Sequence, residues 1–281
     1  MPARPADSNK YDFGHVLVLG VSRGMMGAPR LAALGALRGG AGLVTLGVPD
    51  SLETIAAGGP WEAMTLPLPE RSGGLSDRGL SSVRDFIRHR RVSCVALGPG
   101  VGRGKATVGF VRRYLQSVDV PTVLDADGLT GLSLLGAAKW KPPLILTPHP
   151  GEMARLLETT TATVQKDRQA AASKSARRFN AVVVLKGHRT VVTDGDKVYV
   201  NTTGNPGMAT AGMGDVLAGL IAALFAQVKA TTLSEKLWRC AVLGVHLHGQ
   251  AGDLASQKTG PLSLLASDLP NQWGQVLNWS S

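Results

Sequence analysis

The chain has 281 residues, of which 44% are hydrophobic and 5% aromatic, and its formal net charge is +10 at pH 7. This length fits one large α/β domain or two small ones. The longest apolar candidate, residues 216–226, is shorter than the roughly 18 residues that a membrane helix needs. The N-terminal sequence MPARPADSNKYDFG lacks the apolar core of a signal peptide, so we expect a cytoplasmic protein with no membrane partner.

Composition also disfavours two other classes of site. The only cysteines, Cys94 and Cys240, offer neither a disulfide framework nor a CxxC metal pattern. Much of the basic charge lies in two short runs, 88–91 and 174–178, on stretches that predict amphipathic helices. Because few aromatic residues are available to stack on bases, we interpret this charge as solvated helix faces with a general attraction for phosphate-bearing ligands. Nucleic-acid binding is the less favoured interpretation.

Short apolar runs alternate with helical patterns along the chain, which predicts a mostly parallel sheet flanked by helices. The runs are almost continuously apolar, as strands covered on both faces require. In chain order, the predicted strands are residues 15–20, 43–48, 94–97, 122–124, 144–146 and 181–185. The strongest predicted helices are residues 28–38, 214–227 and 233–254.

Two further stretches have a distinctive pattern. Residues 190–193 and 197–201 flank Asp194-Gly195-Asp196, which predicts a β-hairpin. The Pro- and Gly-rich stretch 58–74 is expected to be a surface excursion. Because no internal repeat, long linker or change of composition interrupts the pattern, we expect residues 1–281 to form a single domain with its core at about 12–275.

The most informative motif is GNPGMATAGMGDVLAG, residues 204–219, which leads directly into an apolar helix. Glycines at 212 and 214 let the backbone turn its N–H groups inward, so Gly212, Met213 and Gly214 form a candidate anion hole at a helix start. Asp215 can take a proton from a hydroxyl there while the N–H groups hold phosphoryl oxygens. Asp is also a common helix N-cap, and a shorter GxGD motif would favour that role.

This string resembles the GxGD anion hole of ribokinase-like kinases, in the form found in NAD(P)H-hydrate dehydratases. Those enzymes use ADP or ATP to remove water from damaged NADH and NADPH. The resemblance covers about residues 12–275 and implies a ribokinase-like three-layer α/β/α sandwich with a central, mainly parallel sheet. Segments similar to the family occur in its usual order: GGAGLVTLGVP (39–49), LGPGVGR (97–103), LDADGL (124–129), LTPHPGEMARLL (146–157) and LKGHRTVV (185–192).

The resemblance implies a lyase that acts in metabolite repair on the S epimers of NADHX and NADPHX, the hydrated forms of NADH and NADPH. The C6 hydroxyl would be phosphorylated and then lost as phosphate, which is a better leaving group than hydroxide. Asp215 would be the catalytic base. The implied substrate contacts are Ala41, Gly102, His149 and Asp215. The implied nucleotide contacts are Lys186, Gly187, His188, Arg189, Thr190 and Gly214.

The resemblance also implies Mg²⁺. Glu152 stands three residues beyond His149, a spacing similar to the NxxE motif that helps to hold Mg²⁺ through water, with His in place of Asn. A Glu at a helix start also interacts well with the helix dipole, so both roles stay open. Asp125 and Asp127 follow a strand and could converge on a ligand, but we favour a structural role for them, with a contribution to metal binding or loop order left open.

Other sites are less compatible with the sequence. His246 and His248 are two residues apart on a predicted helix and face different sides, which argues against zinc. The glycines at 20, 24 and 27 have the spacing G-x3-G-x2-G and not GxGxxG, and no GxxxxGK[ST] occurs, so neither a Rossmann nor a P-loop site is expected.

Two alternatives to the dehydratase stay open. A small-molecule kinase would keep the anion hole but release a stable phosphorylated product, and a nucleotide-sensing module would bind without turnover. The short stretch before the first strand leads us to expect no epimerase domain and a separate epimerase as functional partner. The standalone domain favours ADP over ATP as phosphoryl donor, and the family implies a homotetramer.

Overall fold

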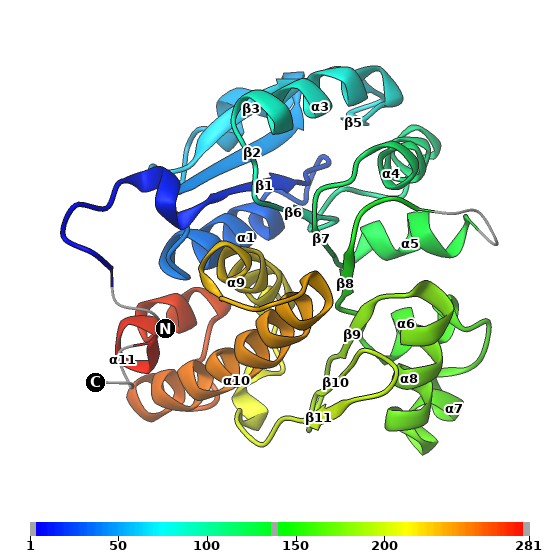
Figure 1. Cartoon of the computed structure of the whole chain (residues 1–281), viewed down its shortest axis with the longest axis vertical. Helices are drawn as coiled ribbons and strands as arrows, with labels where there is room; N and C mark the ends of the chain where they lie inside the picture. Colours follow the sequence, from blue (N-terminus) through cyan, green and yellow to red (C-terminus); the bar gives the residue numbers. More distant parts are fainter. Residues whose placement is uncertain (1–3, 136–139, 278–281) are drawn as a thin grey trace.

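A central sheet contains all of the predicted strands (Figure 1). The computed structural model describes residues 4–135 and 140–277, so the first three residues of the N-terminal stretch lie outside it. Within these residues the strand order is β11-β10-β9-β8-β7-β6-β1-β2-β3. The strands are β1 (His15–Leu19), β2 (Leu43–Pro49), β3 (Met64–Leu68), β6 (Cys94–Leu97), β7 (Thr122–Leu124), β8 (Leu144–Leu146), β9 (Val182–Leu185), β10 (Val191–Thr193) and β11 (Val198–Val200).

Neighbouring strands of this sheet are parallel except around β10. Strand β10 is antiparallel to both β9 and β11, and β10 and β11 form the hairpin expected from Asp194-Gly195-Asp196. A second, two-stranded sheet joins β4 (Glu70–Arg71) to β5 (Gly74–Leu75). The prediction of a mainly parallel sheet is therefore confirmed.

Helices cover both faces of the central sheet (Figure 1). One layer contains α1 (Gly27–Arg38), α9 (Met213–Gln227), α10 (Leu233–Thr259) and α11 (Trp273–Leu277). The other contains α3 (Leu80–His89), α4 (Lys105–Ser117), α5 (Asp127–Ser133), α6 (Pro150–Leu156), α7 (Thr161–Lys166) and α8 (Arg168–Phe179). A short helix, α2 (Glu53–Ala56), follows β2. The predicted three-layer α/β/α sandwich is confirmed.

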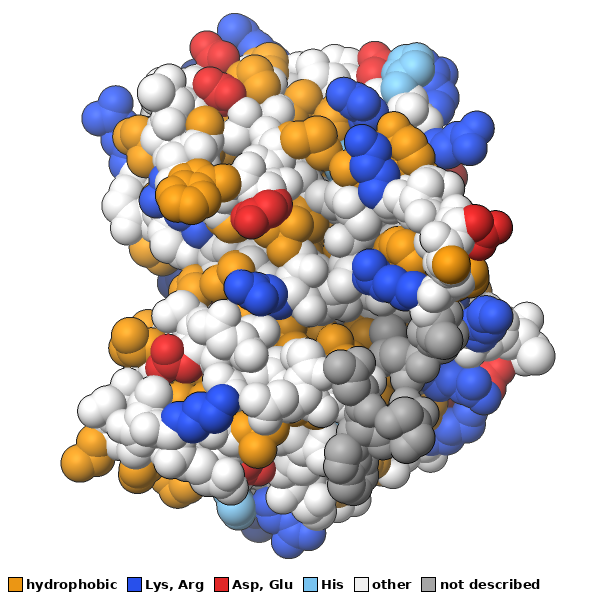
Figure 2. All heavy atoms as spheres, turned by 90° about the vertical axis from the view of Figure 1, so that its left-hand side faces the viewer, with side chains coloured by type: hydrophobic (Ala, Val, Ile, Leu, Met, Phe, Trp, Pro, Cys, Tyr) orange, Lys and Arg blue, Asp and Glu red, His pale blue; other side chains and the backbone are white. Residues whose placement is uncertain are grey.

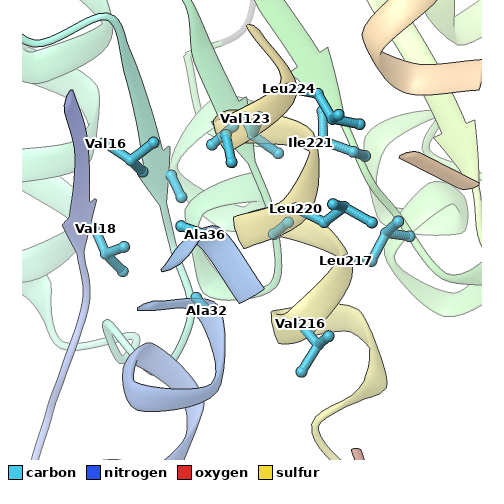
Figure 3. Close-up of a cluster of buried hydrophobic side chains, with 14 of the residues drawn as sticks. Val16, Val18, Ala32, Ala36, Val123, Val216, Leu217, Leu220, Ile221 and Leu224 are labelled. Carbon is cyan, nitrogen blue, oxygen red and sulfur yellow. The ribbon is translucent and has the colours of Figure 1, made fainter. Parts of the chain in front are cut away.

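The two hydrophobic cores follow from the alternation of side chains along each strand. Val16 and Val18 of β1 are fully buried on the side of α1 and α9 (Figure 3). Leu17 and Leu19 of the same strand are fully buried in the core on the opposite face, with side chains of α3 to α8. Because both faces are covered, a nearly continuous apolar sequence is the pattern that such a strand needs.

Helix α9, which begins at the glycine-rich motif, packs closely on α1. Side chains of α9 such as Val216 and Leu220 lie beside Ala32 and Ala36 of α1 (Figure 3). A Cβ atom on Gly219 would clash with the backbone oxygen of Ala32, so only glycine allows this approach. The contact fixes the position of α9 and therefore of Asp215 in its first turn.

The expected surface excursion at 58–74 was only partly correct. Residues Met64–Leu68 form β3, the edge strand that pairs in parallel with β2. Pro67 lies inside this strand and Pro69 directly follows it, and proline argues against a central strand because it cannot donate a ladder hydrogen bond. An edge strand tolerates proline, and the sequence did not distinguish an edge strand from a loop. Helix α10 also extends five residues beyond its predicted end, to Thr259.

Two expectations from composition concern the molecular surface. Within the part of the chain that the structure describes, none of the helices has the length and apolar character to cross a membrane. On the face shown in Figure 2, Lys and Arg side chains lie in several separate places among neutral and hydrophobic side chains. This face therefore carries dispersed positive charge.

Candidate functional site

Three polar side chains meet at the carboxyl edge of the central strands. Asp125 follows β7 and Lys186 follows β9, and the Lys186 Nζ lies 2.5 Å from Asp125 Oδ1. Glu152, near the start of α6, places its Oε2 at 3.9 Å from the same ammonium. Both carboxylates are buried. Segments separated by up to 61 residues thus form one charge cluster, in which the Lys186 ammonium lies between two buried carboxylates.

Lys186 is held in the charged state by this arrangement. Burial by itself would lower its pKa, but the negative charges of Asp125 and Glu152 outweigh burial and raise the pKa above its ordinary value. The backbone around Lys186 is also fixed, because Arg168 Nη2 donates to the carbonyl oxygens of Leu185 at 2.9 Å and Lys186 at 3.2 Å. The structure therefore places the Lys186 ammonium inside the cluster.

Asp215 lies in the first turn of α9 next to this cluster. Burial, reinforced by the nearby charge of Asp125, raises the pKa of Asp215 to about 7, while Lys186 opposes the rise. A carboxylate with this pKa accepts and releases a proton near neutral pH, which is the property that a general base needs. An ordinary, solvated N-cap Asp would not have it.

The backbone before Asp215 has the geometry of an anion site. Gly212 caps α9 in the left-handed region with φ of 88°, and α9 has no side-chain cap. The first N–H groups of α9 therefore stay available to an anion. A Cβ atom on Gly214 would lie 3.1 Å from the Lys186 ammonium, so the absence of a side chain lets that cation approach the helix start. Met213 stands between the two glycines and is buried.

One cavity of about 690 Å³ adjoins this helix start, and all six predicted nucleotide contacts line it. The predicted residues among its walls are His149, Lys186, Gly187, His188, Arg189, Thr190, Met213 and Gly214. Polar side chains with no predicted role at this site also line the cavity: Asn201, Thr203, Asn205 and His248. Asn201 and Thr203 follow β11, Asn205 lies in the glycine-rich motif, and His248 lies within α10.

His248 does not act with His246. The His248 ring is buried, burial lowers its pKa to about 4, and its Nε2 donates to the backbone oxygen of Met213 at 3.0 Å. His246 instead places Nδ1 at 3.3 Å from the hydroxyl of Tyr199. The prediction that the two histidines face different sides is confirmed. His248 supports the glycine-rich turn, which its position in the sequence did not reveal.

His149 and Glu152 form the start of α6 together. Glu152 Oε2 accepts a hydrogen bond from the His149 backbone N–H at 2.7 Å, and His149 Nδ1 accepts one from the Gly151 N–H at 3.0 Å. This is a capping box, with both residues satisfying N–H groups at the helix start. Burial and the Lys186 charge lower the pKa of the His149 ring despite the opposing Glu152 carboxylate.

The carboxylates of Glu152 and Asp125 are the candidate ligands for the predicted Mg²⁺. Among residues 4–135 and 140–277, no group of three or more His, Cys, Asp or Glu side chains is placed to hold a metal ion. Mg²⁺ commonly keeps several waters and binds through one or two carboxylates plus substrate phosphates. Glu152 and Asp125 fit that mode, with Glu152 held in place by its capping bond.

The two strand-end aspartates have different partners. The Asp125 carboxylate is bonded to Lys186 inside the site, whereas Asp127 pairs with Arg103 at 2.6 Å. The alternation of side chains along a strand predicted that both could face one ligand, but the two carboxylates pair with different cations. The position of Asp125 immediately after a fully buried strand was the available signal.

Gly102 and Ala41 lie apart from each other. Gly102 follows β6 and lines a second cavity, of about 1020 Å³, at the carboxyl edge of the sheet. Ala41 precedes β2 at the amino edge, where Gln227 at the end of α9 donates to the Gly39 carbonyl at 2.9 Å. Because the 15 residues of α9 span about 22 Å, the structure does not bring Ala41 together with Asp215.

Comparisons with known proteins all indicate the same family. A family model described as NAD(P)H-hydrate dehydratase matches residues 16–273. The chain is 47% identical to a bifunctional NAD(P)H-hydrate repair enzyme of Moorella thermoacetica, over 96% of this chain and 50% of that protein. It is 40% identical to an ADP-dependent (S)-NAD(P)H-hydrate dehydratase of Neisseria meningitidis, over 95% of this chain and 86% of that one.

Solved structures agree with these relatives. An ADP/ATP-dependent NAD(P)H-hydrate dehydratase of Bacillus subtilis, co-crystallised with ATP and Mg²⁺, superposes with a TM-score of 0.83. The two share 29% identity over 99% of this chain and 94% of that one. A protein of the ribokinase-like superfamily also superposes, so the fold is ribokinase-like. The chain spans about half the length of the bifunctional relatives it matches. From the family model and these relatives, the chain belongs to the NAD(P)H-hydrate dehydratase family.

Proposed function

We propose that the chain is a nucleotide-dependent dehydratase that converts the S epimers of NADHX and NADPHX back to NADH and NADPH. The observation that carries the proposal is Asp215, whose pKa is raised to about 7 beside a glycine-rich helix start and the Lys186 ammonium. A base, an anion hole and a fixed cation are the groups that phosphoryl transfer to a hydroxyl requires.

In the proposed reaction, Asp215 removes the proton of the C6 hydroxyl of the hydrate as the hydroxyl oxygen attacks the terminal phosphorus of the nucleotide. The bond between that phosphorus and the bridging oxygen breaks, and the nucleotide leaves with one phosphate fewer. The C6–O bond then breaks to release inorganic phosphate. Loss of a proton from C5 restores the double bond of the dihydronicotinamide ring.

The charges of the site match the needs of the transferred group. Negative charge on the phosphoryl oxygens is stabilised by the free N–H groups at the start of α9 and by Lys186. Asp125 holds the ammonium at the cluster and acts through Lys186 as a positioning residue. Mg²⁺ would supply further positive charge to the nucleotide phosphates, with Glu152 and Asp125 as the side chains available to hold it through water.

The finer assignments follow the relatives. The name of the Neisseria protein specifies ADP and the S epimer, and we propose both for this chain. A homotetramer, a cytoplasmic location and a separately encoded epimerase partner remain part of the proposal.

The direct test is recovery of dihydronicotinamide absorbance from prepared NADHX, with Mg²⁺ and either ADP, ATP or neither. We expect recovery only with nucleotide, faster with ADP, together with release of inorganic phosphate. A stable phosphorylated product without recovered absorbance would replace the dehydratase with a kinase. Tight nucleotide binding without turnover on either hydrate would indicate a nucleotide-sensing module.

A further inference from the structure

The larger cavity lies where the connections of the sheet diverge. Strands β1 and β6 are neighbours in the sheet. The chain leaves β1 toward β2 on one side, and it leaves β6 toward β7 on the other side. Loops that follow β1 and β6 therefore leave the sheet in opposite directions and open a crevice at its carboxyl edge. Such a switch point is the usual position of a ligand in an open α/β sheet. Ser22 and Arg23 after β1, and residues 101–105 after β6, line the cavity of about 1020 Å³.

Positive charge dominates the walls of this cavity. Its cationic side chains are Arg23, Arg71, Arg103, Lys105, Arg112 and Arg113, and Asp77 is the carboxylate that faces them from its wall. Arg113 pairs with Asp77 at 3.4 Å, and Arg103 pairs with Asp127 at 2.6 Å. Within residues 4–135 and 140–277, the other four cations have no carboxylate partner. We call these four the unpaired cations: Arg23, Arg71, Lys105 and Arg112.

The unpaired cations come from three separate elements. Arg23 lies after β1, Arg71 lies in β4, and Lys105 and Arg112 lie in α4. The stem of Arg23 runs close to Gly73 of the β4–β5 hairpin, about 3.6 Å from where a Cβ would stand, so the hairpin and the β1 loop meet at the cavity. If these were the basic side chains of one solvated helix face, they would all lie on one helix and point outward. Here distant segments converge on one concavity, which implies a polyanionic occupant.

One loop of the cavity wall also contacts the segment that carries Asp125. Val101 and Gly102 line it, and a Cβ atom on Gly98, at the start of the same loop, would clash with the backbone oxygen of Asp125. The Asp125 carboxylate, in turn, is bonded to Lys186 in the reactive cluster. The loop that lines the cavity therefore packs against the segment that carries Asp125, so a dinucleotide with its nicotinamide end near Asp215 would reach the cavity by lying along this loop.

We propose that the unpaired cations bind the phosphates of the hydrated dinucleotide, and that they include the recognition site for the 2′-phosphate that distinguishes NADPHX from NADHX. The inference rests on the proposed function. A diphosphate bridge carries two negative charges, and a phosphate monoester adds about 1.5 to 2 more at pH 7. Four cations without carboxylate partners match the diphosphate and the 2′-phosphate together, and exceed the need of the diphosphate alone.

The test is equilibrium binding of NADPH and NADH to the full chain by calorimetry, without nucleotide. We expect the native chain to bind NADPH about tenfold more tightly than NADH or better, as for a charge-assisted contact. In the double variant Arg71→Ala/Arg112→Ala the ratio should fall below about threefold, mainly through weaker NADPH binding. The single variant Arg112→Glu, which reverses one charge, should also lower the ratio of NADPH to NADH affinity.

The matched control is Arg84→Ala, which removes an exposed arginine of α3 that does not line the cavity. It should leave the NADPH to NADH ratio unchanged. An unchanged ratio in both cavity variants, or equal binding of the two dinucleotides by the native chain, would overturn the inference. Nucleotide-dependent turnover with an unchanged ratio would reject only this inference. A cavity-dependent ratio without turnover of either hydrate would reject only the proposed function.

Discussion

The two cavities at the carboxyl edge of the sheet hold their charges in different ways. Beside the smaller cavity, the buried carboxylates of Asp125 and Glu152 share the half-buried Lys186 ammonium, and Asp215 shares their surroundings. Around the larger cavity the cationic side chains are exposed, and four of them, within the described residues, lack carboxylate partners. Burial strengthens every charge interaction and shifts the pKa of Asp215, whereas solvent screens the exposed cations. The first arrangement suits proton transfer, and the second suits recognition of an anion.

The largest expected effect is a loss of turnover when the proposed base beside the charge cluster is replaced. Replacing Asp215 by Asn removes the proposed base and leaves the size of the side chain almost unchanged. Turnover of NADHX should fall by about two to four orders of magnitude, the range for loss of a general base. The assay is absorbance recovery with saturating nucleotide, and circular dichroism serves as the control for folding. Near-native turnover by a folded Asp215→Asn chain would exclude Asp215 as the base.

The same substitution should stabilise the fold. The pKa of Asp215 is raised from 3.8 to about 7 in the folded chain, so its ionised form favours unfolding. The destabilisation of the folded chain by ionised Asp215 begins as pH rises above about 4 and is complete above about 7. Since one pKa unit corresponds to about 1.4 kcal/mol, Asn should raise the free energy of unfolding by a few kcal/mol at pH 8 and much less at pH 5. Urea denaturation at the two pH values measures this difference, and an equal gain at both would contradict the assignment.

A pair of substitutions separates the influences of Lys186 and Asp125 on the base. Lys186 lowers the pKa of Asp215 and Asp125 raises it. The acid limb of the pH–rate profile should therefore move to higher pH in Lys186→Met and to lower pH in Asp125→Asn. Lys186→Met should also lose about 10- to 100-fold in kcat/KM, because it removes a charge-assisted contact to the phosphoryl group. Limbs that move in the same direction would show that the cluster does not tune Asp215 in this way.

The smallest effect is expected at the exposed cavity. Arg113 and Asp77 form an ion pair at 3.4 Å, with side chains 67% and 49% exposed. Solvent screens such a pair, so Arg113→Ala should change the free energy of unfolding by less than about 1 kcal/mol. Urea denaturation at pH 7 gives the value. A loss above about 2 kcal/mol would show that charges of the larger cavity also support the fold, and would weaken the contrast between the two cavities.

Much of the fold could be predicted from local pattern. Both faces of the sheet are covered, so residues 94–97, 122–124 and 144–146 each show the continuous apolar run of a buried strand, and the structure has strands at those bounds. The edge strand β3 was not predicted, since Pro67 gives the same signal in an edge strand as in a loop. Local periodicity reports burial, and it does not report which strand lies beside which.

For the site, the sequence by itself determined the glycine-rich start of α9 with Asp215 in its first turn, because backbone freedom and helix polarity are local properties. Only the tertiary structure decided that Asp125 joins Lys186 across 61 residues, and that Ala41 lies a helix length away from Asp215. It also decided that cations from the β1 loop, β4 and α4 share one cavity. The pairing of distant strands and the exclusion of water create these neighbourhoods, and neither is encoded in the spacing of residues along the chain.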